Sequence, residues 1–431
     1  MSSLVDNIRK VKEAFAAIKT ALVGKGVTVP SDAKLSDVPA LVESCGKKPL
    51  CTFELTYSDG TKSVETTSEG VVSLMYRCYS RTQVKSVSLT YNSSAVFNTN
   101  ACSMFMNCTS LASLTLPEGF GANITNVNNM FNDCRDLASL TLPKGFGAGI
   151  SDADCMFGGC FSLVSLELPE GFGARITVAD NMFGGCSSLA SLELPEGFGA
   201  NITSANEMFY DCHSMTSLTL PKFFGVEFWS ANHMFYNCRS LTSLTLPRFF
   251  GVIVEETHDM FCYCASLTSL TLPEGFGSSI TNAASMFYNC RSLTSLTLPE
   301  GFGSSITNAA SMFLNCSRLT SLTLPEGFGS SITNATDMFY YCSALTQILA
   351  PEGVTLEDDG SNGILRMKTS FALRSTKLDK DSLIRVIKSL QTVTSATLTL
   401  GTTLLAKLQG DDNAEGAAAL ALAASKGWTI A

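Results

Sequence analysis

The sequence predicts an α/β leucine-rich-repeat solenoid with a parallel β-sheet along one face. Three observations carry this prediction. The pair Met-Phe occurs in ten copies spaced 26 residues apart, from Met104 to Met338. A cysteine follows each of these methionines by four residues, and a proline follows each cysteine by nine. An uninterrupted period of this kind is typical of a solenoid, because each coil buries its apolar side chains only against its neighbours.

The composition narrows the class of protein. A chain of 431 residues exceeds the usual size of a single core, and its 45% hydrophobic and 16% charged residues indicate an ordered chain. The net charge of −9 and the lack of a basic cluster argue against a nucleic-acid partner. We expect no membrane span and no signal peptide, since long apolar runs are missing and Asp6 and Glu13 interrupt the start.

The core stretch of one coil is the segment Ser292–Pro299. Its three leucines provide an apolar face, and Ser295 and Thr297 alternate outward as strand geometry requires. The proline ends the strand because it has no N–H to donate. Glu-Gly-Phe-Gly then turns the corner with its phenylalanine inward, and the returning segment is predicted to be a short helical or irregular turn. Ten coils predict a sheet roughly 50 Å long at a strand spacing of about 4.8 Å.

The repeat cysteines share one position in the coil and should stack in the interior. Disulfides or a chain of metal sites are the alternatives, but the spacing lacks the paired cysteines and nearby histidines of metal sites. We therefore predict small buried core residues with weak S–H donors. The remaining cysteines follow no recognisable framework and are predicted to be free thiols: Cys45, Cys51, Cys78, Cys102, Cys155 and Cys262.

The N-terminal segment, residues 1–48, is predicted to begin with a helix that serves self-association. Its apolar residues are spaced alternately by four and three, as in the seam of a short coiled coil: Leu4, Ile8, Val11, Phe15, Ile18 and Leu22. We expect a homo-oligomer through this helix, or attachment to a larger particle. The alternative is an amphipathic helix that packs on the rest of the chain. A loop and a short helix are predicted over 27–46.

The two ends of the repeat array are predicted to be capped. Residues 49–100 look β-rich, with a hairpin turn at Ser58–Gly60 and a decayed repeat at 74–78. The solenoid itself spans 101–352. Residues 353–431 predict a small α/β cap, with a helix over 379–390, a strand over 395–401 and an alanine-rich helix over 411–426.

A candidate ligand-binding surface lies in the fifth to seventh coils, where the repeat loses its regularity. The corner Glu-Gly-Phe-Gly becomes Lys-Phe-Phe-Gly at 222–225 and Arg-Phe-Phe-Gly at 248–251, with Trp229 nearby. Aromatic and arginine side chains are frequent interface anchors. The alternative is that larger side chains only repack the interior, which we expect of Phe224 and Phe250. The predicted contact residues are Tyr210, His213, Phe223, Phe228, Trp229, His233, Tyr236, Arg239, Arg248, Phe249 and His258.

Two further surfaces are candidates for contact. The outward positions of the strands are nearly all serine and threonine, which suit either a repetitive ligand or simple solvated strand filling. A row of tyrosines follows the Met-Phe pairs and suits either glycan or protein contact or packing between coils; it comprises Tyr210, Tyr236, Tyr288 and Tyr340, with Tyr263 and Tyr341 one position along.

No catalytic or cofactor motif is found, so we expect a protein that is not an enzyme and needs no cofactor. The only dense acidic cluster near the irregular coils is Glu255, Glu256 and Asp259. These residues lie on one short segment, whereas a glycosidase needs carboxylates on two sides of a cleft. The three histidines fall at different positions of the repeat, so no metal site is expected.

The repeats over about 101–352 resemble the BspA-like leucine-rich repeats of bacterial surface proteins, in the motif MFxNCxSLTSLTLPEGFG. The closing segment LTLGTTLLAKL…AASKGWTIA is similar to the ends of repeat proteins encoded by gut bacteria and their prophages. The starting segment AFAAIKTALVGKGVTVPSDAKLSDVPALV is similar to the leader of phage tail-fibre-like proteins. Secreted BspA-like proteins usually begin with a signal or lipoprotein leader, which this start does not resemble.

These resemblances imply adhesion without catalysis. The expected protein is a phage or prophage tail-fibre-type receptor-binding protein that contacts a host cell-surface glycan or protein, located on a virion or at an extracellular surface. A bacterial cell-surface adhesin of BspA-like type is the first alternative. A structural spacer in a larger assembly, whose ends do the work, is the second.

Overall fold

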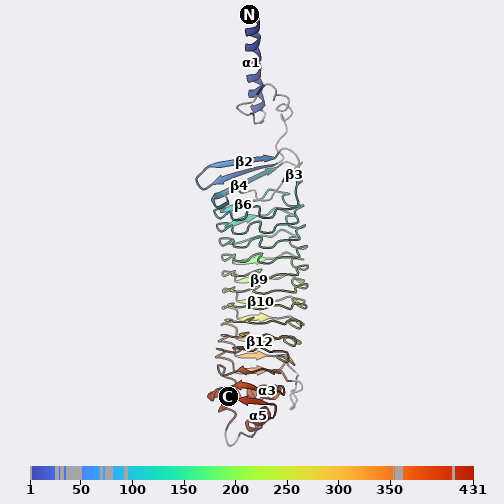
Figure 1. The fold of residues 1–431 in the computed structure, drawn as a ribbon, viewed down its shortest axis with the longest axis vertical. Coiled ribbons are helices and arrows are strands. Elements are labelled where there is room, and N and C mark those ends of the chain that lie inside the picture. The colour runs from blue at the N-terminus through green and yellow to red at the C-terminus, as the bar shows by residue number, and fades with distance from the viewer. Residues whose placement is uncertain are drawn as a thin grey trace.

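The protein is an elongated solenoid with a helix at its N-terminal end and an α/β region at its C-terminal end (Figure 1). The computed structural model describes residues 2–24, 29, 34, 51–67, 71–72, 81–91, 96–352, 354, 363–409 and 413–431. The expected fold class, a parallel solenoid with a 26-residue repeat, is confirmed.

One side of the solenoid is a ladder of three-residue parallel strands. They are β6 (Ser113–Thr115), β7 (Ser139–Thr141), β8 (Ser191–Glu193), β9 (Ser217–Thr219), β10 (Ser243–Thr245), β11 (Ser269–Thr271), β12 (Ser295–Thr297), β13 (Ser321–Thr323) and β14 (Gln347–Leu349). Paired strands are in register, as where Leu296 lies opposite Leu322. The central leucine is buried and its neighbours face outward, so the alternating pattern in the sequence reports the side-chain directions.

Two further sides of each coil are also hydrogen-bonded to the next coil. A column of single parallel bridges runs from Asn100 to Asn334, one bridge per coil. On the third side, the amide of each Met-Phe phenylalanine from Phe105 to Phe313 donates to the methionine carbonyl one coil on, as from Phe287 to Met312 at 2.9 Å. Since all three sides are bonded at the same 26-residue offset, an insertion in any coil would break several ladders at once.

The returning segment is an irregular turn, which settles the choice between a helical and an irregular form. The residues directly before the methionine and directly before the cysteine have positive φ angles, as at Ser285 (52°) and Asn289 (62°). A left-handed residue every four positions prevents a right-handed helix from propagating.

The interior consists of side-chain columns that run along the solenoid axis. The phenylalanines of the Met-Phe pairs stack with near-parallel rings, as Phe287 and Phe313 do at 5.5 Å between centroids. The corner phenylalanines form a second column, as in Phe302 and Phe328 at 6.4 Å. Phe224 and Phe250, expected in the core, are fully buried in this second column.

The cysteine ladder is buried as predicted. Each repeat cysteine is fully buried, and each from Cys134 onward donates its S–H to a phenylalanine carbonyl of the preceding coil; for Cys238 and Phe209 the distance is 3.2 Å. Burial raises the pKa of the Cys238 thiol to about 12. The described cysteines form no disulfide with one another, and the repeat thiols serve as small core groups.

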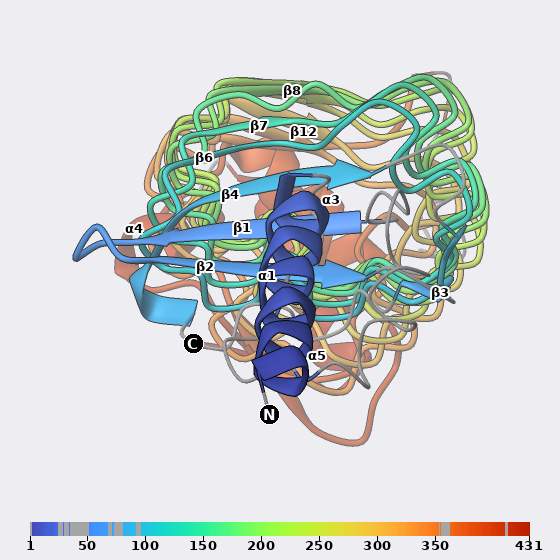
Figure 2. The ribbon, with the colours of Figure 1, turned by 90° about the horizontal axis from the view of Figure 1, so that it is seen from above.

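The N-terminal end of the solenoid is covered by an antiparallel sheet of order β2-β1-β4 (Figure 2). β1 (Cys51–Tyr57) and β2 (Lys62–Thr67) form the predicted hairpin, in whose turn Asp59 accepts from the Thr61 amide at 2.9 Å, and β4 spans Val84–Tyr91. Shorter elements are β3 (Val71–Val72), η2 (Arg81–Gln83) and β5 (Val96–Phe97). The loop and helix predicted over 27–46 and the decayed repeat at 74–78 lie essentially outside the described residues.

Helix α1 (Ser2–Gly24) stands beyond this sheet, apart from the described coils (Figure 1). Val11 is 51% exposed, and Phe15 and Ile18 are only partly buried, so part of the predicted seam is open to solvent. The side chains of Leu4, Ile8 and Leu22 lie outside the described residues, and self-association stays a prediction. None of the described helices combines the length and apolarity needed to cross a bilayer.

The C-terminal region matches its predicted elements closely. A parallel sheet of order β15-β16-β17 is packed with helices; the elements are β15 (Phe371–Ala372), α3 (Lys380–Ser389), β16 (Ala396–Thr399), α4 (Thr402–Leu405), α5 (Ala414–Ser425) and β17 (Trp428–Ile430). Asp379 caps α3 by accepting from Ser382 N. Arg385 donates to the Ile348 carbonyl of the last strand at 2.6 Å, so α3 closes this end of the solenoid.

Candidate binding surface

The fifth to eighth coils carry a continuous row of tyrosine rings on their returning turns. Tyr210 stacks on Tyr236 at 4.9 Å, Tyr236 meets Tyr263 at 5.7 Å, and Tyr263 meets Tyr288 at 5.2 Å. All four rings are partly buried, because each leans on its neighbour in the next coil. Burial is the first cause that raises the pKa of Tyr236, to about 12, so its phenol keeps its proton even in mildly alkaline solution.

Polar side chains border this tyrosine row. His213 and Arg239 occupy the same position in neighbouring coils and both contact Asn237, with Nε2 of His213 3.0 Å from Asn237 Nδ2 and Arg239 Nε 2.6 Å from Asn237 Oδ1. Asn237 also donates to Asp211 Oδ1 at 2.5 Å. Arg239 is exposed, and its hydrogen bond to Asn237 holds the guanidinium in a defined position that a ligand can reach.

A second group of candidate residues lies at the corner that follows the strand. Phe223 and Phe249 stand one coil apart and are 42% and 40% exposed, although both are apolar. Each has a cation over its ring: Lys222 lies 5.0 Å from Phe223, and Arg248 lies 5.4 Å from Phe249. Further apolar side chains are exposed on the same two corner loops, namely Trp229, Val252 and Ile253. Exposed apolar groups gathered in this way mark a surface for contact.

The prediction for Phe228 is wrong. Its side chain is fully buried and packs edge-on between Phe224 and Phe250, at 5.2 and 5.5 Å. Counting the 26-residue period shows the reason, since Phe228 stands where later coils have the core residues Ile280 and Ile306. The next residue, Trp229, points the other way and is 52% exposed.

The predicted contact residues therefore form two groups and not one continuous patch. The turn group gathers around the tyrosine row and holds Tyr210, His213, His233, Tyr236, Arg239 and His258. The corner group holds Phe223, Trp229, Arg248 and Phe249. Both groups repeat their exposed chemistry over successive coils, so a ligand could follow either of them along the solenoid axis.

Two of the three histidines come together, contrary to the expectation from their repeat positions. The rings of His233 and His258 lie 4.6 Å apart and nearly perpendicular. His233 Nε2 is also 3.6 Å from Asp259 Oδ2. Burial is the main cause that lowers the pKa of His233, with His258 acting in the same direction and Asp259 opposing it. His213 lies elsewhere on the turn surface, paired with Asp211.

The acidic cluster of the same coils is divided among separate contacts. Asp259 faces His233, whereas Glu256 accepts from the Thr281 hydroxyl at 3.4 Å and its backbone belongs to the bridge column. Glu255 is exposed.

The sequence analysis missed an exposed apolar site in the third coil. Phe161 is 43% exposed and Val164 is 56% exposed, and Arg135 lies 5.7 Å from the Phe161 ring. Phe161 directly follows the repeat cysteine, where the other coils carry Ser, Thr, Ala, Arg or His. The same comparison between repeats that drew attention to the fifth coil would have found it.

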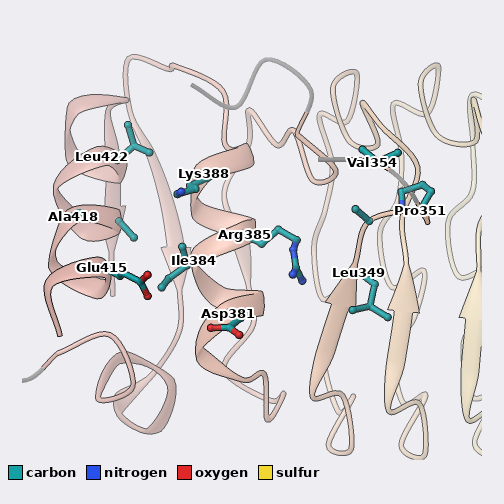
Figure 3. Close-up of a pocket in the computed structure, with 12 residues that line it drawn as sticks. Leu349, Pro351, Val354, Asp381, Ile384, Arg385, Lys388, Glu415, Ala418 and Leu422 are labelled. Carbon is teal, nitrogen blue, oxygen red and sulfur yellow. The ribbon is translucent and has the colours of Figure 1, made fainter. Parts of the chain in front are cut away.

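Two hollows occur elsewhere on the described surface. One, of about 720 Å³, lies along the strand face, and its lining includes serines and threonines of β11 and β12 and the glutamates that follow these strands, Glu274 and Glu300. The other, of about 830 Å³, lies between the last coil and helices α3 and α5 (Figure 3). Arg385 and Lys388 face it from α3, and Glu415 and Leu422 from α5. It is an open junction between the solenoid and its cap.

Comparison with known proteins places the repeats in a family. The family model described as "BspA type Leucine rich repeat region (6 copies)" matches residues 56–151, 153–257 and 231–359. A leucine rich cell surface protein from Faecalibacterium prausnitzii is similar at 18% identity over 70% of this chain and 93% of that chain, with a TM-score of 0.30. The leucine-rich-repeat protein of T. pallidum is similar at 18% identity over 62% and 86%, with a TM-score of 0.23. No curated protein sequence matches the chain. On the extent of the family match, the chain belongs to the BspA-type leucine-rich repeat proteins.

Proposed function

We propose that the chain is a non-enzymatic adhesion protein that binds a host cell-surface glycan or protein through its fifth to seventh coils. The observation that carries the proposal is the tyrosine row together with the exposed aromatics at the corners of the same coils. A leucine-rich-repeat fold suits such a role, since it is typical of binding and scaffold proteins.

The physical case rests on preorganisation. Each tyrosine of the row is held by ring contacts to its neighbours, so little side-chain freedom is lost when a ligand binds. Aromatic faces stack on the apolar faces of sugars or on protein side chains, and the phenol and guanidinium groups at the margin supply directional hydrogen bonds. Both ligand classes use these features, so the binding assay must include both.

The finer proposal is a receptor-binding protein of phage tail-fibre type. Helix α1 supports it, because its exposed Val11 and partly exposed Phe15 leave an apolar seam for a second copy or a larger particle. The seam of α1 would then attach the protein to its particle or to other copies, and the contact groups would recognise the ligand. A bacterial surface adhesin would use the same contact groups and differ in what its N-terminal end joins.

The test is binding of the full chain to a glycan array and to a panel of bacterial cells. We expect Trp229→Ala together with Phe249→Ala, or Tyr236→Ala, to weaken binding by at least about tenfold, as loss of an aromatic anchor does. Phe161→Ala is the matched control, because Phe161 is exposed to the same degree as Phe249 but lies outside both groups. Equal binding by all variants would contradict the proposed surface.

A structural spacer is the second candidate, and the near-identical coils that begin at Met286 and Met312 favour it. Removing residues 208–285 in frame deletes three whole repeats and preserves the register of the ladders on either side. A spacer would shorten and keep its binding, whereas the proposed adhesion protein would lose it.

A further inference from the structure

Three potential metal ligands converge between the sixth and seventh Met-Phe turns. His233 and Asp259 occupy the same position in neighbouring coils, directly before the methionine, and the His233 amide donates to the His258 carbonyl at 3.0 Å. One ligand atom from each of His233, His258 and Asp259 lies within 4.8 Å of the others. Among the described residues this is the one group of three histidine, cysteine or carboxylate side chains with that proximity.

We propose that His233, His258 and Asp259 bind a divalent transition-metal ion of the zinc class. Two imidazole nitrogens and one carboxylate oxygen suit Zn²⁺ and its neighbours, whereas Ca²⁺ and Mg²⁺ prefer oxygen ligands throughout. Ligands about 2.0–2.1 Å from a tetrahedral ion lie roughly 3.4 Å apart. The 3.6 Å between His233 Nε2 and Asp259 Oδ2 is close to this separation, and the His258 ligand atom lies within 4.8 Å of both.

An independent observation points to a ligand for His258. Its Nδ1 atom is buried and has no hydrogen-bond partner among the described residues. Buried polar atoms are satisfied in the great majority of cases, so an orphaned nitrogen on a ring that lies close to a second imidazole and a carboxylate requires an explanation. A bound ion held by Nδ1 would supply the missing partner.

The column that contains His258 supports the same conclusion. In the two preceding coils this position holds Asn206 and Asn232, and each amide oxygen accepts from the backbone one coil on, ending with Asn232 and the His258 amide at 3.0 Å. In the following coil the equivalent amide, that of Ala284, donates to Asn282 Oδ1 within its own coil at 3.2 Å, and His258 accepts no such bond. The His258 side chain is therefore released from the ladder and free to serve another purpose.

The backbone holds the site in place while leaving it accessible. His233 and Asp259 have φ angles of 55° and 58°, in turns whose next residue is a fully buried methionine of the core. Their side chains are 30% and 26% exposed, so an ion can enter from solvent. Three protein ligands leave one tetrahedral position for water or for an atom of a bound partner.

The pair His213 and Asp211 provides a control within the same protein. His213 Nε2 lies 3.3 Å from Asp211 Oδ1, a distance similar to that of His233 and Asp259. It lacks a second imidazole among the described residues and is not part of a three-ligand group. The proposal predicts that this pair contributes nothing to tight metal binding.

The test is calorimetric titration of the reduced, full-length protein with zinc chloride. We expect one ion per chain, and a loss of affinity greater than about tenfold in His233→Asn, His258→Asn and Asp259→Asn, since even outer-shell changes at metal sites cost about 10–100-fold. His213→Asn should bind as the unaltered protein does. Circular dichroism of each variant establishes that it is folded. The test measures zinc affinity alone, so it does not depend on whether a variant still binds the glycan or protein of the proposed function.

Two results would overturn the proposal. The first is the absence of binding at micromolar zinc, or equal affinity in the His233, His258 and His213 variants. The second is a cobalt-substituted protein with an intense thiolate-to-metal band that Cys262→Ser removes, because the ion would then be held by thiols. Cobalt bands of a purely nitrogen and oxygen site that disappear in His258→Asn would support it.

Discussion

The corner glycines offer a sharp test of how the coils pack. Gly275 and Gly277 belong to the same Glu-Gly-Phe-Gly turn and have nearly equal φ angles, +80° and +83°. A Cβ added at Gly275 would meet nothing within 4 Å, whereas at Gly277 it would lie 2.1 Å from Cδ2 of Phe302. Phe302 cannot yield, because it is fully buried in the corner column between Phe276 and Phe328.

The two substitutions to alanine separate backbone strain from steric overlap. An alanine in the left-handed conformation destabilises the folded state by about 1–2 kcal/mol. Because alanine also reduces the conformational entropy of the unfolded chain, about 0.4–1 kcal/mol of this loss is offset. Gly275→Ala should therefore lower the free energy of unfolding by about 1 kcal/mol. Gly277→Ala carries the same backbone contribution and a further ~1–3 kcal/mol for overpacking a core that cannot expand.

Urea denaturation followed by far-ultraviolet circular dichroism measures the difference, with the slope checked for both variants because long repeat arrays can lose two-state behaviour. Hydrogen exchange of the peptides around Phe302 shows whether the loss is local. Equal midpoints for Gly275→Ala and Gly277→Ala, or a larger loss at Gly275, would refute the steric argument and imply that the phenylalanine column adjusts freely.

Further predictions concern the thiols, the tryptophan loop, the tyrosine row and α1. Alkylation of the native protein should label Cys102, which is partly exposed, well before Cys186, whose pKa burial raises to about 12; comparable labelling of the repeat cysteines would show that the ladder opens readily. Phe228→Ala should lower the free energy of unfolding by about 3–5 kcal/mol as a large core truncation does, whereas Trp229→Ala should change it little, and a reversed order in thermal or urea unfolding would contradict their assigned directions. The pKa of Tyr236 is raised in the folded state, so its contribution to stability is complete below the ordinary tyrosine pKa of about 10 and is lost as the pH rises toward about 12. Tyrosinate absorbance, measured together with unfolding, would detect this loss. A free energy of unfolding that increases over this range would contradict the prediction. Light scattering should give a multimer for the full chain and a monomer for a chain that begins at Pro49, and a monomer in both cases would remove self-association from the role of α1.

The sequence by itself determined the features that repeat. The 26-residue period predicted the parallel ladder, the buried cysteines and the inward corner phenylalanines, because a side chain at one position meets the same residue type in the next coil. Local signals also located the hairpin at Asp59 and the helix capped by Asp379, since both depend on residues adjacent in the chain. Phe228 was within reach of the same reasoning, because strict counting places it at the core isoleucine position.

Tertiary structure alone decided which candidate residues meet. His233 and His258 are 25 residues apart, one short of the period, and their repeat positions argued against contact. Coils stacked about 4.8 Å apart make each residue a neighbour of several residues in the next coil, the diagonal ones included. Side chains as long as histidine and tyrosine cross that diagonal, as His233 does to His258 and Tyr236 does to Tyr263. Periodicity identifies the column in which a residue stands, and only the packed coils show which side chains reach across to the next column.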